Sequence, residues 1–370
     1  MTETGISPED RRGSGSARLA AGRQLPKLLF ATSLERLRAS IGAAADEATE
    51  LIRSAGMELL DVGGAAAPWR TVASAAASVE GIVLLGGYDV LPSLRLDVLP
   101  AMLRRRLGHP LDLDDFLVWS DEGYGDVDGN GLPELPVSRI PDGRSGDLVM
   151  KALRGTILAP RHERFGLRNV ARPFADGVYA GVPGSEAMLV SEPSTSGDLE
   201  VERLAALNLY LMLHGSNGDL ASFWGESTGG AMVEALNAPQ IRELDGGVVF
   251  AGCCYGGLTV EERAHEIADH EVPTVVEWDR SLALTMLARG ASAFVGCTGT
   301  HYSPGVPGIF GSQVLHEAFW RHVSAGSAPA RALYDAKIDY ITRMPYNGDL
   351  GMVAVLLKMW RQFTCLGLGW

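Results

Sequence analysis

Cysteine is scarce in this chain of 370 residues, which has only Cys253, Cys254, Cys297 and Cys365. Two of the four are adjacent, and adjacent cysteines rarely form a disulfide with each other. No pair has the C-x-x-C spacing of a zinc or redox site. The sequence therefore predicts reduced thiols and no metal site built on cysteine, which is typical of a cytoplasmic protein.

Long hydrophobic runs and a signal pattern at the N-terminus are also missing. No apolar run approaches the ~18 residues that a membrane span requires. The net charge of −13 argues against nucleic acid or an anionic membrane as a partner, because both select basic protein surfaces. The same charge is weakly compatible with a cationic substrate. We expect a soluble, cytoplasmic protein with no nucleic-acid and no membrane partner, and its oligomeric state stays open.

What the chain does contain is ordinary globular composition, with 46% hydrophobic and 21% charged residues. Residues 1–24 are polar and predict a flexible tail without core-forming residues. After the tail, apolar strand patterns alternate with helical patterns, which indicates a mainly parallel sheet covered on both faces. The expected strands are 27–30, 57–62, 81–85 and 116–119, and the expected helices are 34–55, 68–78 and 146–156.

The second half alternates in the same way after a segment, 157–198, that predicts little regular structure. Its expected strands end at His214, at the Cys253–Cys254 pair and at Gly296, and its expected helices are 280–289, 312–324 and 328–343. We therefore predict an α/β fold with two subdomains. Residues 25–158 form a supporting subdomain, and residues 159–370 form the subdomain that carries the chemistry.

The strand ends at 214 and 253 carry the most reactive side chains of the chain. An apolar run ends in His214 and Gly215, and a second ends in Gly252, Cys253 and Cys254. The carboxyl ends of parallel strands form the crevice where α/β proteins bind ligands. If the two strands are neighbours, an imidazole that titrates near neutral pH faces a thiol that it can deprotonate. From the spacing alone, a catalytic dyad and a pair of structural residues are about equally supported.

Three further stretches, in the same order along the chain, carry a resemblance. Residues 84–92 read LLGGYDVLP, residues 120–141 run from Ser-Asp through an Asp-rich turn to SRIP, and Trp224 follows His214 closely. With the two strand ends, these stretches resemble the gingipain-like cysteine peptidases of the clan that includes caspases and legumains. The resemblance covers residue 80 to the C-terminus. It implies a caspase-like three-layer sandwich and an endopeptidase that cleaves polypeptides through an acyl-thioester, without a cofactor.

The resemblance also implies roles for individual residues. His214 corresponds to the general base and acid, and the N–H of Gly215 to part of the oxyanion hole. Cys254 is favoured as the nucleophile, with Cys253 as the second choice. Residues 294–304 resemble the loop that walls the substrate pocket, which implies pocket roles for Thr300, His301 and Tyr302. A Gly/Ser/Pro loop that happens to carry a tyrosine is the alternative for this segment.

Several features stay open or depart from the family. Residues 126–131 begin like a calcium loop, but Val137 stands where the bidentate glutamate is required, so a structural turn is favoured and no metal is expected. Asp176 and Glu186 are candidates to orient His214, with no basis for choosing between them. No signal or propeptide is visible, and the C-terminal segment ends in Gly-Leu-Gly instead of the family's Gly-Asp-Pro turn. A non-catalytic interaction module with a caspase-like fold is the main alternative function, and a flavodoxin-like small-molecule binder is a weaker one.

Overall fold

The computed structural model describes residues 18–22, 24–107, 112–155, 162–244, 246–268, 271–304, 309–346 and 349–370. Most of the predicted tail, residues 1–17 and 23, lies outside the described residues, as does the stretch 156–161 where the predicted subdomains meet. At the end of that tail, Leu19 and Ala20 are buried in a short 3-10 turn, η2 (Leu19–Gly22). The expectation that residues up to 24 contribute nothing to a core is therefore corrected at these two positions.

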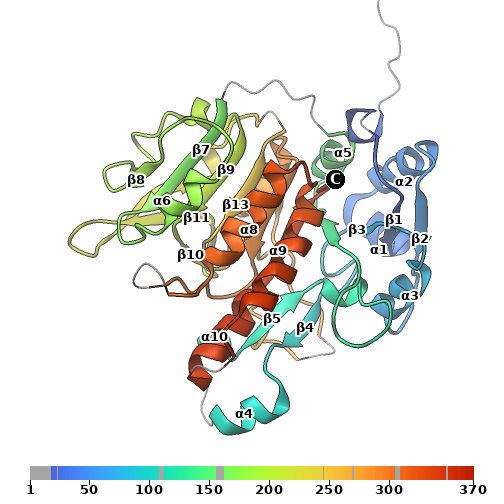
Figure 1. Ribbon diagram of the computed structural model, residues 1–370. Helices are drawn as coiled ribbons and strands as arrows, with labels where there is room; N and C mark the ends of the chain where they lie inside the picture. Colours follow the sequence, from blue (N-terminus) through green and yellow to red (C-terminus); the bar gives the residue numbers. More distant parts are fainter. Residues whose placement is uncertain are drawn as a thin grey trace, which may run out of the picture.

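A single ten-stranded sheet runs through the described chain (Figure 1). Every neighbouring pair is parallel except β14 and β15, which confirms the predicted mainly parallel α/β fold. In spatial order the strands are β2 (Glu58–Asp61), β1 (Leu28–Thr32), β3 (Gly81–Leu85), β6 (Val137–Ile140), β15 (Phe363–Gly367), β14 (Ala293–Cys297), β13 (Val248–Ala251), β9 (Ala206–Met212), β7 (His162–Asn169) and β8 (Leu189–Ser191).

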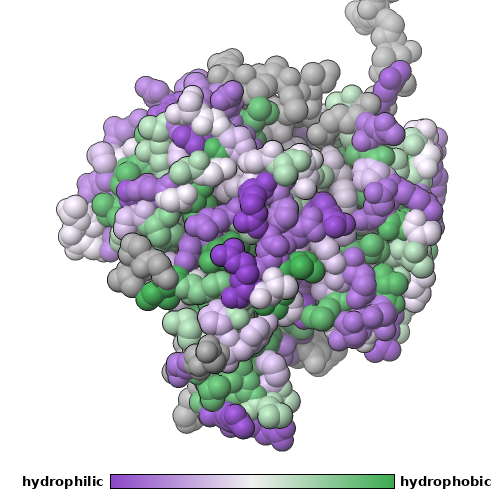
Figure 2. Space-filling view, in the orientation of Figure 1, coloured by the Kyte–Doolittle hydropathy of each residue, from purple (hydrophilic) through white to green (hydrophobic). Residues whose placement is uncertain are grey.

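Helices cover the sheet because its strands are apolar on both faces. Successive residues of a strand point to opposite faces. On β9, Tyr210 and Met212 pack with helices α8 and α9, whereas Leu209 and Leu211 pack with α7 on the other side. The helices are α1 (Leu34–Ile41), α2 (Ala44–Ser54), α3 (Pro68–Ala75), α4 (Ala101–Leu107), α5 (Gly146–Arg154), α6 (Ala175–Ala180), α7 (Leu282–Ala288), α8 (Gln313–Ser324), α9 (Pro329–Arg343) and α10 (Leu350–Arg361). Figure 2 shows mainly hydrophilic residues over the outer side of α8 and α9.

Two small antiparallel sheets flank the main one. A ribbon of β10 (His214–Ser216), β11 (Asp219–Glu226) and β12 (Met232–Asn237) follows β9 directly. The predicted strand 116–119 exists as β5 (Leu117–Ser120), but it pairs with β4 (Leu94–Asp97) outside the main sheet. No helix of the described residues combines the length and hydropathy required to cross a membrane.

The buried guanidinium of Arg139 joins residues 84–92 to residues 120–141, the two upstream stretches on which the resemblance partly rests. Arg139 is fully buried on β6 and forms a bidentate ion pair with Asp121, with N–O distances of 2.7 and 2.8 Å. It also donates hydrogen bonds to the carbonyl oxygens of Gly86 and Leu91, at 2.8 and 2.9 Å. The charged group is thus fully partnered, as a buried charge must be. Residues 84–92 and 120–141 are held together by one side chain that lies outside the candidate site.

Candidate active site

The strands that end in histidine and cysteine are adjacent. β9 and β13 pair in parallel, with Leu209 opposite Val249 and Leu211 opposite Ala251. The N–H of Gly252 extends the pairing by donating to the carbonyl oxygen of Leu211 at 2.8 Å. His214 and Cys254 therefore emerge at the same carboxyl edge of the sheet, as the sequence predicted for neighbouring strands.

Backbone contact brings the two strand ends together at Gly215. A Cβ atom placed on Gly215 would lie 2.0 Å from the carbonyl oxygen of Cys254, which is well inside the van der Waals limit. Only glycine lets the two backbones approach this closely. The residue assigned to the oxyanion hole from the resemblance is thus the point where the histidine loop touches the cysteine loop.

His214 is held by a carboxylate that the sequence did not reveal. Its Nε2 forms a hydrogen bond of 3.1 Å with Oε2 of Glu226, at the end of β11. This bond, together with a hydrogen bond from Asn169, lowers the pKa of the Glu226 carboxyl below its ordinary value. Glu226 reaches His214 because β11 folds back antiparallel on β10, placing Trp224 opposite His214.

Neither of the two acids considered from the sequence contacts His214. Asp176 forms an ion pair with Arg168 at 2.7 Å. Glu186 accepts hydrogen bonds from the backbone N–H groups of Glu163 and Arg164. Both lie in the segment that predicted little regular structure and in fact contains β7, α6 and β8. A polar run a dozen residues after the histidine was the only sequence signal for Glu226.

Cys254 and Cys253 have different surroundings. Cys254 is partly exposed, and its Sγ accepts a hydrogen bond from the N–H of His301 at 3.3 Å. Burial raises the pKa of the Cys254 thiol, and the N–H of His301 acts in the opposite direction. Cys253 is fully buried, packs in the core with Leu211, and has a pKa raised well above the ordinary thiol value by burial.

The imidazole and the thiol are not hydrogen-bonded in this structure. Among the hydrogen bonds of the described residues, none joins His214 to Cys254, and the imidazole uses Nε2 for Glu226. Catalytic hydrogen bonds are often long or misaligned before substrate binds, so this geometry is compatible with a dyad. With Nε2–H donating to Glu226, Nδ1 is the nitrogen left to accept a proton.

The predicted pocket segment, residues 300–302, lies against the thiol through its backbone. The side chains of Thr300 and His301 are only 7% and 8% exposed, so they do not face open solvent. Tyr302 is half-buried and donates a hydrogen bond to Oδ1 of Asp112 at 2.6 Å. Its ring lines a cavity of about 340 Å³ with the apolar side chains of Phe310, Met352, Leu356 and Met359.

A buried lysine, which the sequence analysis missed, supports this segment. Lys358 lies on α10, fully buried, and forms ion pairs with Asp112 (2.6 Å) and Asp114. Asp114 also accepts a hydrogen bond from the N–H of Thr300 at 2.6 Å. Burial alone would raise the pKa of Asp114, but Lys358 and the hydrogen bonds outweigh it and hold that pKa below its ordinary value. The charges of Lys358 and its partners thereby fix the loop beside Cys254.

A chain of hydrogen bonds between buried rings continues behind the thiol. Tyr210 bonds to Nδ1 of His316 at 2.9 Å, and Nε2 of His316 lies 3.3 Å from Nε2 of His301. Burial lowers the pKa of His301 to about 3 and that of His316 well below its ordinary value. Both rings are therefore neutral near pH 7, and neither is a source of positive charge for the thiolate.

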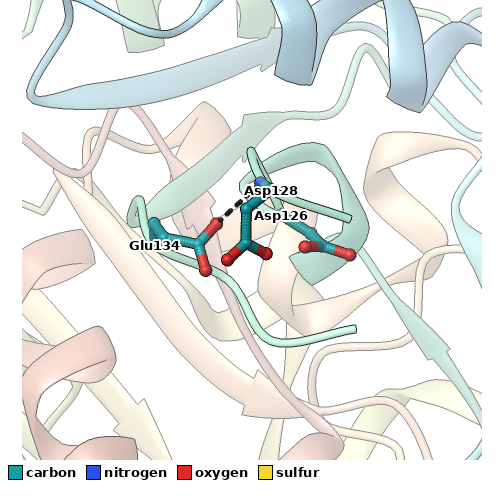
Figure 3. A group of neighbouring side chains, drawn as sticks. All are labelled: Asp126, Asp128 and Glu134. Atoms are coloured by element: carbon teal, nitrogen blue, oxygen red, sulfur yellow. Dashed lines mark hydrogen bonds between the residues drawn. The ribbon is translucent and has the colours of Figure 1, made fainter. Parts of the chain in front are cut away.

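The Asp-rich turn lies away from these residues and contains a third carboxylate. Figure 3 shows Asp126, Asp128 and Glu134 drawn together, with carboxylate oxygens within 4.8 Å of one another. Glu134 accepts a hydrogen bond from the N–H of Val127 at 2.7 Å, and Asp126 accepts one from the N–H of Gly131 at 2.9 Å. These hydrogen bonds hold the turn, and the three carboxylates lie close enough together to share one metal ion.

Comparison with known proteins identifies solved structures that have the same fold as this chain. No protein-family model matches the sequence, and no curated protein matches it either. Solved structures do match: the Arg-specific cysteine proteinase gingipain R aligns with a TM-score of 0.58 at 9% identity, over 94% of this chain and 78% of that chain. This chain has the fold of gingipain R. The complex of the pro- and mature domains of Porphyromonas gingivalis RgpB gives 0.57 at 10% identity (92% and 78% covered), and a structure described as a protease gives 0.54 at 13% (94% and 78%). The caspase-like fold implied by the resemblance is confirmed.

Proposed function

We propose that this protein is a cysteine endopeptidase in which Cys254 is the nucleophile and His214 is the general base and acid. One observation carries the proposal. The adjacent parallel strands β9 and β13 end in these two residues, and Gly215 packs directly on the backbone of Cys254. Two strand ends in contact at the carboxyl edge of the sheet provide a nucleophile, a base and N–H donors in one place. Cys253 is unsuited to the role because it is buried in the core.

The first half of the reaction forms an acyl-thioester. Nδ1 of His214 accepts the proton of the Cys254 thiol, and the thiolate attacks the carbonyl carbon of the substrate peptide bond. The N–H groups of Gly215 and Cys254 stabilise the negative oxygen of the tetrahedral intermediate. The C–N bond then breaks, and the imidazolium returns its proton to the leaving amine.

Hydrolysis completes the cycle. His214 takes a proton from a water molecule, whose oxygen attacks the thioester carbonyl. The C–S bond breaks, the substrate leaves as a carboxylic acid, and the Cys254 sulfur recovers a proton from the imidazolium. Glu226 holds the ring in the required tautomer through both halves and stabilises the imidazolium that forms in each.

A thiol in this environment depends on its base. Because burial raises the pKa of Cys254, only a small fraction is thiolate at neutral pH without a nearby proton acceptor. The alternative function, an interaction module without catalysis, would leave both cysteines no more reactive than a free thiol.

The test compares the two adjacent cysteines. The purified protein is incubated with a peptide library, and cleavage products are identified by mass spectrometry. We expect cleavage by the unaltered protein and by the control Cys253→Ala, and none by Cys254→Ala or His214→Ala. Loss of cleavage in Cys253→Ala with retention in Cys254→Ala would reverse the assignment of the nucleophile. Absence of cleavage and of rapid thiol alkylation in the unaltered protein would favour the interaction module.

A further inference from the structure

A turn after β7 places an arginine at the same edge as the candidate dyad. β7 is the neighbour of β9 on the side away from β13. The carbonyl oxygen of Asn169, the last residue of β7, accepts a hydrogen bond from the N–H of Arg172 at 3.0 Å. The Asn169 side chain accepts another from the N–H of Ala171 at 2.8 Å and donates one to Glu226 at 3.4 Å. One residue thus fixes both the turn that carries Arg172 and the carboxylate that orients His214.

Arg172 has no acidic partner in the described part of the chain. Its side-chain hydrogen bond goes to the carbonyl oxygen of Ala171, at 3.4 Å, and no carboxylate of the described residues lies within ion-pair distance. The nearby acids have other partners, since Asp176 pairs with Arg168 and Glu226 binds His214 and Asn169. The guanidinium is only partly exposed, and most of its N–H groups are therefore available to bind the anionic group of a ligand.

The charge of Arg172 reaches three groups of the site. Burial has the largest effect on the pKa of Cys254 and raises it, while Arg172 is among the charges that lower it. For His301, whose pKa is lowered mainly by burial, Arg172 adds to the lowering. It also adds to the lowering of the pKa of Glu226, after the hydrogen bonds from His214 and Asn169. These effects place the guanidinium within electrostatic range of the thiol and of Glu226, the carboxylate that binds His214.

We propose that Arg172 selects substrates with a carboxylate side chain, Asp or Glu, at the residue whose carbonyl carbon is attacked. The inference rests on the proposed function and names its substrate class. The planar guanidinium binds a carboxylate through two parallel N–H···O bonds, which gives geometric selectivity as well as attraction. A lysine or arginine side chain at the same position would instead meet an unneutralised positive charge.

The carboxylates on the other side of the thiol are not available to bind a basic substrate side chain. Asp112 and Asp114 are buried and engaged by Lys358, and they also accept hydrogen bonds from Tyr302 and Tyr255. The net charge of −13, which is weakly compatible with a cationic substrate, is therefore no guide to the local charge at this edge of the sheet. Local charge at Arg172 decides the selectivity, since exposed charges farther away are screened by salt.

The experiment uses four tripeptide acyloxymethyl ketones that differ only in the residue beside the reactive group: Asp, Glu, Lys or Arg. The thiolate displaces the carboxylate leaving group, and the new thioether on Cys254 is followed by intact mass. We expect the Asp and Glu probes to react at least about tenfold faster than the Lys and Arg probes. Arg172→Glu should abolish or invert this ratio, and Arg172→Lys should reduce it. Arg242→Glu, an equal charge change at an exposed residue before the amino end of β13, should preserve it.

Alkylation of Cys254 by iodoacetamide, which has no side chain to recognise, is measured on every variant. It shows that the nucleophile is intact where the probe selectivity changes. Equal or faster reaction of the basic probes, or a ratio unchanged by Arg172→Glu, would overturn the role of Arg172 and leave the peptidase proposal standing. If iodoacetamide reacts and none of the four probes does, the inference fails; the peptidase proposal fails with it only if the peptide library is also not cleaved.

Discussion

Gly215 shows how one missing side chain determines the geometry of the site. Its place in the histidine loop puts it against the carbonyl oxygen of Cys254, where a Cβ would lie 2.0 Å away. Either the loop or the strand end must move if a methyl group is added, and both carry proposed catalytic residues. A displacement of about 1 Å at a reacting group can cost roughly 100-fold in rate.

We therefore expect Gly215→Ala to lower kcat/KM for peptide cleavage by about 100-fold or more. The matched control is Gly218→Ala in the same hairpin, where the nearest atom to an added Cβ is the Ser216 hydroxyl at 3.6 Å. The control should keep kcat/KM within a few-fold of the unaltered protein. A Gly215→Ala variant with unchanged kinetics would show that the contact with Cys254 has no part in catalysis.

The same scale shows what the sequence could and could not predict about the site. The sequence identified His214, Gly215 and the cysteine pair because they directly follow apolar runs. A strand end of this kind can be recognised from the order of residues alone. Glu226, Arg172 and Lys358 were not, because each reaches the site from an element whose position depends on tertiary packing. Glu226 lies on a ribbon, Arg172 follows a strand of mixed polarity, and Lys358 is on a helix that the sequence analysis did not predict.

At the scale of elements, α10 contributes an internal cation to the loop beside Cys254. Lys358 is fully buried and is the counter-charge that Asp112 and Asp114 share, while its helix packs against α4 and β5. Removing one partner of a buried charged group leaves the others uncompensated, which is far more costly than losing an exposed ion pair.

Lys358→Met should lower the free energy of unfolding by about 3–5 kcal/mol, because two buried carboxylates lose their counter-charge. Lys151→Met is the matched control, since Lys151 pairs with Glu243 on the surface and its loss should cost less than about 1 kcal/mol. Urea unfolding followed by circular dichroism measures both. Similar losses in the two variants would contradict a structural role for the buried lysine.

Helices and strands with one clear pattern of apolar residues were predictable from the sequence, whereas those that mix apolar and charged residues were not. The buried strands β1, β3 and β13 and the helices α8 and α9 lie where the sequence placed them. The expected helix 34–55 is divided into α1 and α2 at Gly42, whose φ of 60° ends the first helix. β7 and β8 were missed because charged residues alternate with apolar ones on β7, so its apolar pattern is weaker than that of a fully buried parallel strand.

For the whole molecule, the buried histidines predict sensitivity to acid. His301 has a folded pKa of about 3 and His316 one well below its ordinary value, whereas an unfolded histidine titrates near 6.5. Below pH 6.5 the unfolded chain binds protons that the folded chain excludes, so stability falls as the pH decreases. Above pH 6.5 both states leave these rings neutral, and the contribution is constant.

We expect the free energy of unfolding to fall between pH 6.5 and 4.5, with each buried histidine contributing up to about 1.4 kcal/mol per pH unit. His301→Gln should make this decrease less steep, because one proton-binding site is removed from the unfolded state. Thr298→Val, at a buried residue without a titratable side chain, is the control and should leave the slope unchanged. Urea titrations at several pH values measure the slopes, and identical slopes for the two variants would contradict the prediction.

The position of β15 has a consequence for the order of assembly. β15 pairs with β14 on one side and with β6 on the other, although it follows every other strand of the sheet in sequence. While the chain is being synthesised, β6 and β14 must each present an unpaired edge until residues 363–367 emerge. Exposed edges of this kind invite pairing with other chains. A chain connected in this way cannot complete this sheet, or the crevice along its edge, before residues 363–367 have been made.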